Sequence, residues 1–486
     1  MDKNLILEDV LEEFTKLAEI PRPSGHEKKV SDYIASRLKE LGLEVVQDQY
    51  NNIIANKKAE PGFEHVPLIL FQGHMDMVCV ADPGVQYDPV KDAIKVKNDG
   101  KYLFAEGTSL GADDGIGVAS VIYLLTQKFV HGPLRAIFTV DEENGMTGAR
   151  GLDKKYLENV KYVINCDSED YDVVTVGSAG SVRLNFVSDV DVCNRFNGDS
   201  SASIIIKNLL GGHSGAEINQ NRANAIKILT IILQRLEKNN ICFEVADING
   251  GAAVNAIAAK ASADIVYNKT DENKIKAVID EVQCEFTEVY GSAEEKAAFI
   301  FTPITMSNTV IDKKTVNKLI MLLSALHSGV YAMSQTTADL PELSANIGRV
   351  YIKDKKVVVS LLARSATNAN LSFIKNSYEA FACLTGFKVK FAPTSPAWNG
   401  NADSELVRMA LDIFKRQNNK YMKVEFIHGG LECNYFSDKM PQLEIISIGP
   451  NNIDIHTPQE RLQLDTIIPQ ICLMKEMTEQ IAEKGK

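Results

Sequence analysis

The chain has 486 residues, of which 45% are hydrophobic and 24% are charged. This is the usage of an ordinary globular protein, and it excludes a disordered, collagen-like or coiled-coil chain. With 52 Lys and Arg against 64 Asp and Glu, the formal net charge is −12, which argues against a nucleic-acid partner because phosphate binding needs a basic surface. The acidic surplus is either a solvated surface or carboxylates gathered around bound cations.

The ends and the hydropathy of the chain predict a cytoplasmic protein. The N-terminal residues lack the basic segment followed by an apolar run that marks a signal peptide. No stretch of about 18 apolar residues is present, so we expect no membrane partner. The eight cysteines are scattered without a CxxC pair, which predicts reduced thiols and not a disulfide framework or a thiolate zinc site.

The first 180 residues alternate between predicted strands and helices. Ser24 to Glu27 reads S-x-x-E, a capping box before an amphipathic helix that ends at Gly42. A helix of small residues is expected from Asp114 to about Gln127. Strands are predicted at residues 43–47, 52–56, 67–72, 134–140 and 162–167. The last two are continuous apolar runs, typical of strands buried on both faces, so we expect an α/β sandwich with a mainly parallel sheet.

From about residue 181 the pattern changes to α+β. Alternating strands now share the chain with long amphipathic helices at 223–236 and 316–326. A turn-rich segment at 392–400 ends this block, and helix–strand alternation then resumes. The simplest organisation is a discontinuous α/β domain formed by 1–180 and 396–486, with an α+β domain of 181–395 inserted into it.

Four acidic or His-containing segments lie near the ends of predicted strands, where open α/β sheets bind their ligands. His74 and Asp76 are two apart on an extended chain, so their side chains point the same way, as a metal-binding imidazole and its supporting carboxylate do. The alternative is a surface His beside an Asp. Asp113 stands among glycines at a helix start, where simple helix capping is the alternative.

The other segments add three carboxylates. Glu142 and Glu143 belong to three adjacent acids at the end of an extended strand, a costly arrangement unless a cation neutralises it, although a solvated loop is an alternative. Asp167 ends another strand, and His456, in the segment 449–458, is added to these candidates. Five residues then supply the mixture of nitrogen and oxygen ligands that zinc accepts, with Asp113 able to bridge two metals: His74, Asp113, Glu143, Asp167 and His456.

These motifs resemble those of the M20 family of di-zinc metallopeptidases, and most closely its aminoacyl-histidine dipeptidases. The matching segments run in family order through nearly the whole chain: PRPSGHE at 21–27, GHMDMV at 73–78, LGADDGIG at 110–117, TVDEENGMTGA at 139–149, NCDSE at 165–169, GGHSG at 211–215, HGGLEC at 428–433 and GPNNIDIHTPQERL at 449–462. The resemblance implies a zinc-exopeptidase-like α/β sandwich as the catalytic domain, with an inserted α+β lid domain.

The resemblance also implies roles for individual residues. Asp113 would bridge two Zn²⁺ ions, for which Co²⁺ or Mn²⁺ are substitutes, and its peptide bond to Asp114 would be cis. His74 and Asp167 would complete one site, and Glu143 and His456 the other. Asp76 would orient His74. Glu142 would be the general base that takes a proton from a water activated by the two metals, in the hydrolysis of Xaa-His and other unblocked dipeptides.

The lid contributes further candidates by the same resemblance. His213 would stabilise the oxyanion, with Ser214 capping a helix at 216 as the alternative reading of this motif. Arg364 would clamp the substrate carboxylate with its planar fork, with a plain surface Arg as the alternative. Asn255 and Glu432 are weaker matches to substrate-contacting positions. The oligomeric state is open between a homodimer and a lid that contains both halves of a family dimer.

Four other functions compete with this one. Gly107 to Gly111 fits G-x-S-x-G with Ser109 as the nucleophile of a serine hydrolase, but that interpretation leaves the carboxylates unexplained. A metal-binding homologue without turnover would lack the base, and Glu142 is present. Within the family, the alternatives are a tripeptide aminopeptidase and an N-acyl-amino-acid deacylase.

Overall fold

The computed structural model describes residues 3–195, 198–305 and 307–485. The chain forms two compact units. Unit 1 consists of Met1–Ser178, Trp398–Phe426 and Leu431–Lys486, and unit 2 consists of Ala179–Ala397 and Ile427–Gly430. Each unit has its own hydrophobic core.

Unit 1 is built on one large mixed sheet. In order across the sheet its strands are β1 (Glu44–Gln47), β2 (Ile53–Lys57), β6 (Leu134–Thr139), β3 (Leu68–His74), β7 (Val160–Asn165), β22 (Glu444–Ser447), β8 (Val173–Ser178) and β20 (Trp398–Asn399), with β21 (Lys423–Ile427) beside β8. The central strands β6, β3, β7 and β22 are parallel. The pairs toward both edges are antiparallel.

The prediction of a mainly parallel sheet was therefore wrong for the edges. Only five residues connect β1 to β2, and a connection of that length can join only antiparallel neighbours. The predicted strands themselves are confirmed, and β3 is buried at every position, as its apolar sequence indicates.

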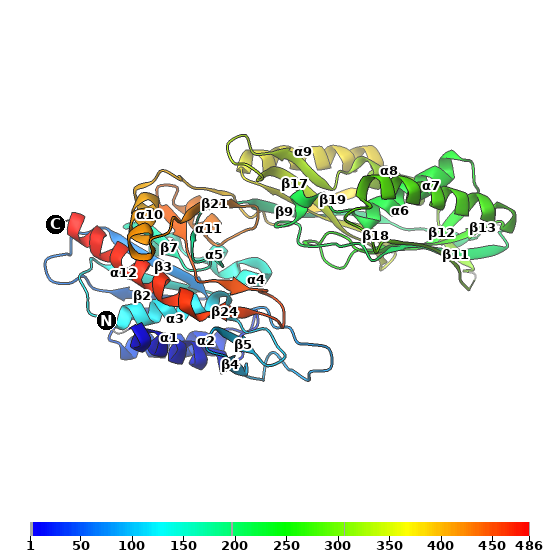
Figure 1. Ribbon diagram of the computed structural model, residues 1–486. Helices are drawn as coiled ribbons and strands as arrows, with labels where there is room; N and C mark the ends of the chain where they lie inside the picture. The colour runs from blue at the N-terminus through cyan, green and yellow to red at the C-terminus, as the bar shows by residue number, and fades with distance from the viewer. Residues whose placement is uncertain (1–2, 196–197, 306, 486) are drawn as a thin grey trace. The chain divides into compact units, whose positions relative to one another are not determined.

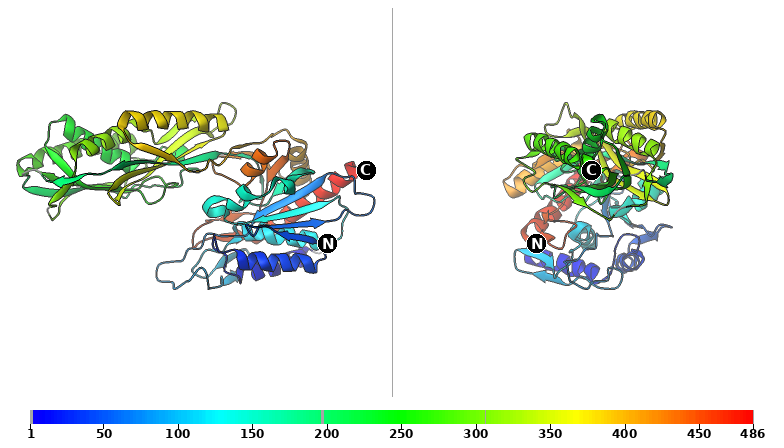
Figure 2. Two further views of the ribbon diagram at one scale, coloured as in Figure 1. Left: turned by 180° about the vertical axis from the view of Figure 1, so that it is seen from behind. Right: turned by 90° about the vertical axis from the view of Figure 1, so that its right-hand side faces the viewer.

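Helices cover both faces of this sheet (Figures 1 and 2). The cluster on one face includes the apolar sides of α1 (Lys3–Ala18), α2 (Lys28–Glu40), α3 (Ala112–Thr126), α10 (Glu405–Asn418) and α12 (Ile467–Lys484). The other face carries α5 (Thr147–Gly151) and α11 (Cys433–Lys439), and α11 contacts β22 and β20. The expected α/β sandwich is confirmed.

The central parallel strands end together. In the registers His74 pairs with Thr139, and Gln72 pairs with Asn165. The loops that follow β3, β6 and β7 therefore leave the sheet at one edge, where α/β folds place their ligands. A small antiparallel sheet of β4 (Val96–Asn98), β5 (Tyr102–Ala105), β24 (Arg461–Gln463) and β23 (Asn452–Ile453) completes the unit.

Unit 2 has a second large sheet, and every pair in it is antiparallel. Its order is β14 (Ala298–Pro303), β11 (Ser200–Lys207), β13 (Ala261–Tyr267), β12 (Phe243–Gly250), β17 (Pro341–Lys353), β18 (Lys356–Ser365), β9 (Gly180–Asp189) and β19 (Lys388–Phe391), with β16 (Gly329–Met333) beside β17. A short pair is formed by β10 (Val192–Asn194) and β15 (Thr309–Ile311). Four helices lie on one face of the large sheet (Figures 1 and 2): α6 (Ala225–Lys238), α7 (Glu272–Tyr290), α8 (Lys313–Ala325) and α9 (Asn368–Thr385). This is the α+β arrangement expected for the inserted block.

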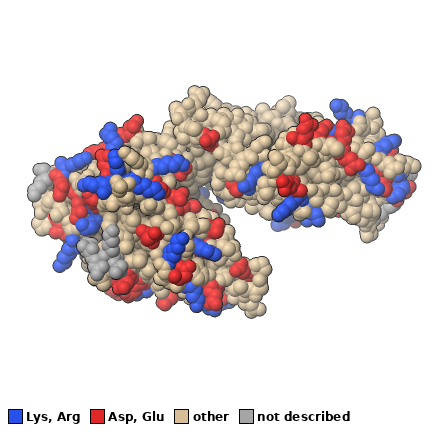
Figure 3. Space-filling view, in the orientation of Figure 1, with Lys and Arg blue, Asp and Glu red and all other residues tan. Residues whose placement is uncertain are grey.

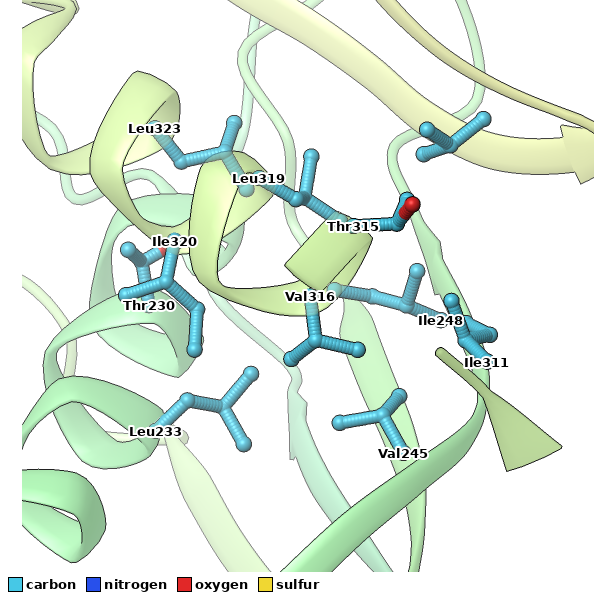
Figure 4. A pocket seen from close by; sticks show the side chains of 11 residues that line it. Thr230, Leu233, Val245, Ile248, Ile311, Thr315, Val316, Leu319, Ile320 and Leu323 are labelled. Carbon is cyan, nitrogen blue, oxygen red and sulfur yellow. The ribbon is translucent and has the colours of Figure 1, made fainter. Parts of the chain in front are cut away.

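An internal cavity of ≈ 10 Å³ lies between α6, α8 and β12 (Figure 4). Its lining is aliphatic apart from two threonines, and the Thr230 hydroxyl already donates to Ile226 O within α6. A space of this size without convergent polar groups is a packing gap in the core of unit 2.

Charges are interspersed on the face shown in Figure 3, where acidic and basic side chains alternate over both units. The acidic side chains seen on this face are thus solvated surface. None of the described helices is both long and apolar enough to cross a membrane.

Candidate metal centre

One group of possible metal ligands forms at the end of β3. His74 is the last residue of this strand, and its side chain is 1% exposed. Its Nε2 lies 3.0 Å from Asp113 Oδ1 and 3.3 Å from Asp167 Oδ1. Asp167 follows β7, the neighbouring parallel strand, which explains why residues 93 positions apart meet here.

A second group shares Asp113 with the first. His456 Nε2 lies 3.1 Å from Asp113 Oδ2 and 2.8 Å from Glu143 Oε1. In each group the ligand atoms lie within 4.8 Å of one another. The two oxygens of Asp113 therefore face two different imidazoles, and the Asp113–Asp114 peptide bond is cis.

Glu142 lies beside both groups, in a third set with His74 and Glu143. The expectation that Glu142 and Glu143 end an extended strand was wrong. Asp141 adopts a left-handed conformation, with φ of 57°, and the next four residues form a short helix, α4 (Glu142–Gly145). Adjacent residues on a helix differ by about 100° in direction, so these neighbouring side chains still diverge.

Asp76 supports both halves of this arrangement. Its carboxylate is 0% exposed, and Oδ1 lies 3.4 Å from His74 Nδ1. The same carboxylate accepts the backbone N–H groups of Glu142 at 3.0 Å and Glu143 at 3.2 Å. Asp76 therefore fixes the imidazole on β3 and the start of α4 together.

The predicted capping box was wrong, because both of its residues serve this loop cluster. Ser24 Oγ donates to Asp76 Oδ2 at 2.7 Å, and Glu27 Oε1 accepts the N–H groups of Gly25 and Asp141. The helix itself is present as α2, without a side-chain cap. The local spacing of Ser24 and Glu27 favoured a helix cap, but this spacing could not predict their contacts with Asp76 and Asp141, which are distant in sequence.

The carboxylates are held where their charges repel one another. Burial, with the nearby charge of Asp113, raises the pKa of Asp167 to about 7 against the opposing effect of His74. Burial also raises the pKa of Glu142 well above its usual range, and Glu143 and Asp167 add to the rise. Although burial lowers the pKa of His456, its hydrogen bonds to Asp113 and Glu143 outweigh this and raise it to about 11.

Such a donor set fits divalent cations. Two imidazoles and three carboxylates form two overlapping triads, which is the ligand chemistry of zinc and similar metals. A cation in each triad would neutralise the carboxylates that otherwise retain protons. The side chain of His456 is 41% exposed, so the site is open to solvent on that side.

Ser109 does not have the environment of a catalytic nucleophile. It is 0% exposed, its Oγ donates to Val78 O at 2.7 Å, and it accepts the N–H of Val80. A hydroxyl with both roles filled by backbone groups has no histidine base. The serine-hydrolase alternative is thus contradicted.

In unit 2, His213 lies on an exposed loop with Asn255 close to it. Asn255 O accepts the N–H of Ser214 at 2.8 Å, and His213 forms a bridge with Ala256. His213 Nδ1 accepts the N–H of Ala216 at 3.3 Å, which assigns the proton to Nε2 in the neutral ring. The helix considered at 216 is absent, and only a short 3₁₀ turn occurs at Ile218–Gln220.

Arg364 is a buried cation in unit 2. It is 8% exposed, lies opposite Ser344 in the β17–β18 register, and its Nε has no hydrogen-bond partner. Burial, with the nearby charge of Arg183, lowers the pKa of Arg364 to about 10. It is therefore not a plain surface residue, and no described acidic side chain pairs with it.

His428, which the sequence analysis did not single out, borders this cation. Its Nε2 lies 2.7 Å from Ser344 Oγ. Burial, and then the charge of Arg364, lower the pKa of His428 to about 3, so the imidazole is neutral. A neutral imidazole adds no positive charge beside the guanidinium.

Glu432 lies in unit 1 and is 0% exposed. Its Oε2 accepts hydrogen bonds from Gln72 Nε2 at 2.6 Å and Thr139 Oγ1 at 2.5 Å, and burial raises its pKa to about 8. This position beneath the ends of β3 and β6 does not favour the predicted contact with substrate.

The fold and the ligand cluster define a metallopeptidase of the α/β class. A model of peptidase family M20/M25/M40 matches residues 70–480, and the chain belongs to this family.

Relatives can be named more particularly. The chain is 31% identical to the cytosol non-specific dipeptidase of Escherichia coli over 97% of both proteins. It is similar to the crystal structure of aminoacylhistidine dipeptidase from Vibrio alginolyticus, with a TM-score of 0.81, 29% identity and 96% of each chain covered. A tripeptidase from Staphylococcus aureus shares the fold, with a TM-score of 0.56 at 18% identity over 98% of this chain and 99% of that one.

Proposed function

We propose that the protein is a two-metal dipeptidase that hydrolyses Xaa-His and other unblocked dipeptides. The observation that carries the proposal is the pair of ligand triads sharing Asp113, with Glu142 beside both. The similarity to two proteins named as dipeptidases, over almost the whole chain, supports dipeptides as the substrate class.

In this proposal two Zn²⁺ ions would be held by the two triads, which share Asp113. His74 and Asp167 would complete the first site, and Glu143 and His456 the second. Bound divalent ions supply Lewis acidity, lowering the pKa of water and polarising a carbonyl oxygen.

Glu142 is the proton carrier of the proposed reaction. Its carboxylate accepts a proton from the attacking water and then gives that proton to the nitrogen of the leaving amine. The Glu142 N–H is fixed by Asp76, so the base and His74 are oriented by one buried carboxylate. No described side chain hydrogen-bonds to the Glu142 carboxylate, which leaves it available to water.

In this proposal unit 1 is the catalytic domain and unit 2 binds the substrate. Unit 2 is proposed to be the lid domain that the sequence predicts for 181–395. Arg364 takes the C-terminal carboxylate of the dipeptide, because a buried guanidinium without a counter-ion favours an anionic ligand. The Nε2–H of His213 donates to the oxyanion, and Asn255 supports the same loop.

Metal identity, location and assembly belong to the same proposal. Nitrogen and carboxylate ligands favour Zn²⁺, with Co²⁺ or Mn²⁺ as substitutes. The chain is proposed to act in the cytoplasm, and the homodimer remains a prediction.

A substrate panel tests the proposed activity. The zinc-loaded protein is assayed with Gly-Gly, β-Ala-His and another Xaa-His dipeptide, beside tripeptides and N-acetyl amino acids. We expect hydrolysis of the free dipeptides to dominate, and a chelator should abolish it. Preferential cleavage of tripeptides would indicate an aminopeptidase, and preferential cleavage of N-acetyl amino acids a deacylase; either result would replace the proposed substrate class.

Substitution of Arg364 tests the carboxylate clamp. Arg364→Ala should raise KM for dipeptides on the order of 10- to 100-fold, because a hydrogen bond to a charged group contributes about 1.5–3 kcal/mol. Arg364→Lys, which keeps the charge but not the fork, should recover part of the loss. Amidation of the substrate C-terminus should raise KM for the wild type but add little in Arg364→Ala. Equal KM values for Arg364→Ala and wild type would refute the assignment.

A further inference from the structure

Glu460 is a buried carboxylate without an assigned role. It is 2% exposed and lies four residues after His456. Its Oε2 accepts the backbone N–H groups of Leu110 at 2.8 Å and Gly111 at 2.9 Å, and its Oε1 accepts those of Ala112 at 2.8 Å and Asp113 at 3.4 Å. One side chain thus binds four consecutive N–H groups about 350 residues away.

Some of these four N–H groups lie at the start of α3, a helix whose N-cap residue makes no side-chain cap. Gly111, the residue before the helix, is left-handed with φ of 72° and makes no side-chain cap. Successive N–H groups in this conformation form a concave anion site, and the first N–H groups of a helix lack partners within the helix. Here the anion is supplied by the chain itself, in charge-assisted hydrogen bonds.

Arg22 holds the opposite side of the same loop. Its guanidinium is 2% exposed and donates to Gly111 O at 2.5 Å and to the carbonyl oxygens of Met75 and Asp76. Gly111 is fixed through its N–H by Glu460 and through its C=O by Arg22. A Cβ at Gly111 would lie 2.5 Å from Met77 Sδ, so a larger residue would displace this side chain and would also be strained by the positive φ.

Glu460 also belongs to the hairpin that carries His456. The hairpin strands β23 and β24 are antiparallel, and Asn452 Nδ2 on β23 donates to Glu460 Oε1 at 3.3 Å. Glu460 stands at the end of the turn just before β24. Glu460 therefore joins the His456 hairpin to the loop of Asp113, the shared member of both triads.

We propose that Glu460 is a positioning residue that sets the spacing between Asp113 and His456 and so preorganises the second metal site. The inference rests on the proposed two-metal centre. The second site draws two of its three ligands from the segments joined by Glu460, whereas the first keeps His74 and Asp167 on β3 and after β7. Loss of the link should therefore affect the second metal more than the first.

Glu460→Gln is the direct test. Gln keeps the size of the Glu460 side chain but replaces one of its two oxygens by an NH₂ group. That group cannot accept hydrogen bonds, so only one of the two pairs of backbone N–H groups keeps its acceptor. Supporting residues of this kind typically change metal affinity by about 10- to 100-fold. In Zn²⁺ titrations of the full-length apoprotein against a chelating dye, we expect a loss of this size for the second equivalent and a smaller one for the first. Glu460→Asp, which keeps both oxygens, should recover part of the affinity.

Glu444→Gln is the matched control. Glu444 Oε2 accepts the N–H of Leu406 at the start of α10, which carries no proposed ligand. This variant should bind both equivalents as the wild type does. Wild-type affinity in Glu460→Gln, or an equal loss in Glu444→Gln, would overturn the inference.

Hydrogen exchange of the wild-type apoprotein gives a second readout if Glu460→Gln does not fold. The amides of residues 110–113 should exchange slowly although none of them can donate to a hydrogen bond within α3. Exchange at the rate of an exposed loop would refute the link. Absence of zinc binding by the wild type would instead refute the metal centre, so the two failures are distinguishable.

Discussion

Glu142→Gln should lose on the order of 10²–10⁴ in kcat while retaining both metals, because the amide keeps the size of the side chain but removes the base. The structure gives a reason to expect an intact site. The Glu142 N–H that contacts Asp76 belongs to the backbone and is unchanged by the substitution. Zinc content and kcat are measured on the same preparation.

Glu143→Gln is the matched comparison, since it makes the same chemical change one residue away. Glu143 Oε1 lies 2.8 Å from His456 Nε2, within the second triad. This variant should lose affinity for one metal and regain activity in excess zinc. If Glu142→Gln loses metal and Glu143→Gln keeps it, the roles of the two residues are reversed.

Asp113→Ala should remove both metals and with them all hydrolysis. Its two carboxylate oxygens are divided between the triads, so neither site keeps a full set of ligands. Because even supporting residues change affinity by about 10- to 100-fold, loss of a direct shared ligand should exceed about 100-fold at each site. Zinc titration of the variant measures this directly.

Asp167→Ala separates the two sites. Asp167 belongs only to the triad of His74, so its removal should weaken one equivalent and leave the other. Asp153→Ala, which removes an exposed carboxylate from a loop in the same unit, should bind zinc as the wild type does. Retention of one tight equivalent in Asp113→Ala would contradict a bridging role.

The metal-ligand candidates could be predicted from sequence because each follows a recognisable local pattern. His74 ends β3, Asp167 lies two residues after β7, and Glu143 lies four residues after β6, on α4. The apolar sequences of these three strands indicate central, buried positions. Neighbouring parallel strands end at the same edge of a sheet, so the sequence predicts that these side chains lie close together. Asp113, in the first turn of α3, and His456, in a turn, were included because they complete a nitrogen and oxygen ligand set, and the family resemblance then implied their roles.

The supporting contacts could not be predicted in the same way. Ser24 has the spacing of a helix cap, but Asp76 offers its hydroxyl a buried charged acceptor, and this tertiary contact outweighs the local preference. Glu460 has no local signal, because its four partners lie in a loop that is distant in sequence. The start of α4 depends on the left-handed Asp141, which an acidic run does not specify.

The proposal of a two-metal dipeptidase is tested most directly by a zinc titration of apoprotein from which a chelator has removed the metal. Gly-Gly hydrolysis is followed at each addition of zinc. The account predicts that the rate rises to a maximum at two equivalents per chain and that the metal content at the maximum is two. Full dipeptidase activity in protein that holds no stoichiometric metal, or saturation of both binding and activity at one equivalent, would contradict it.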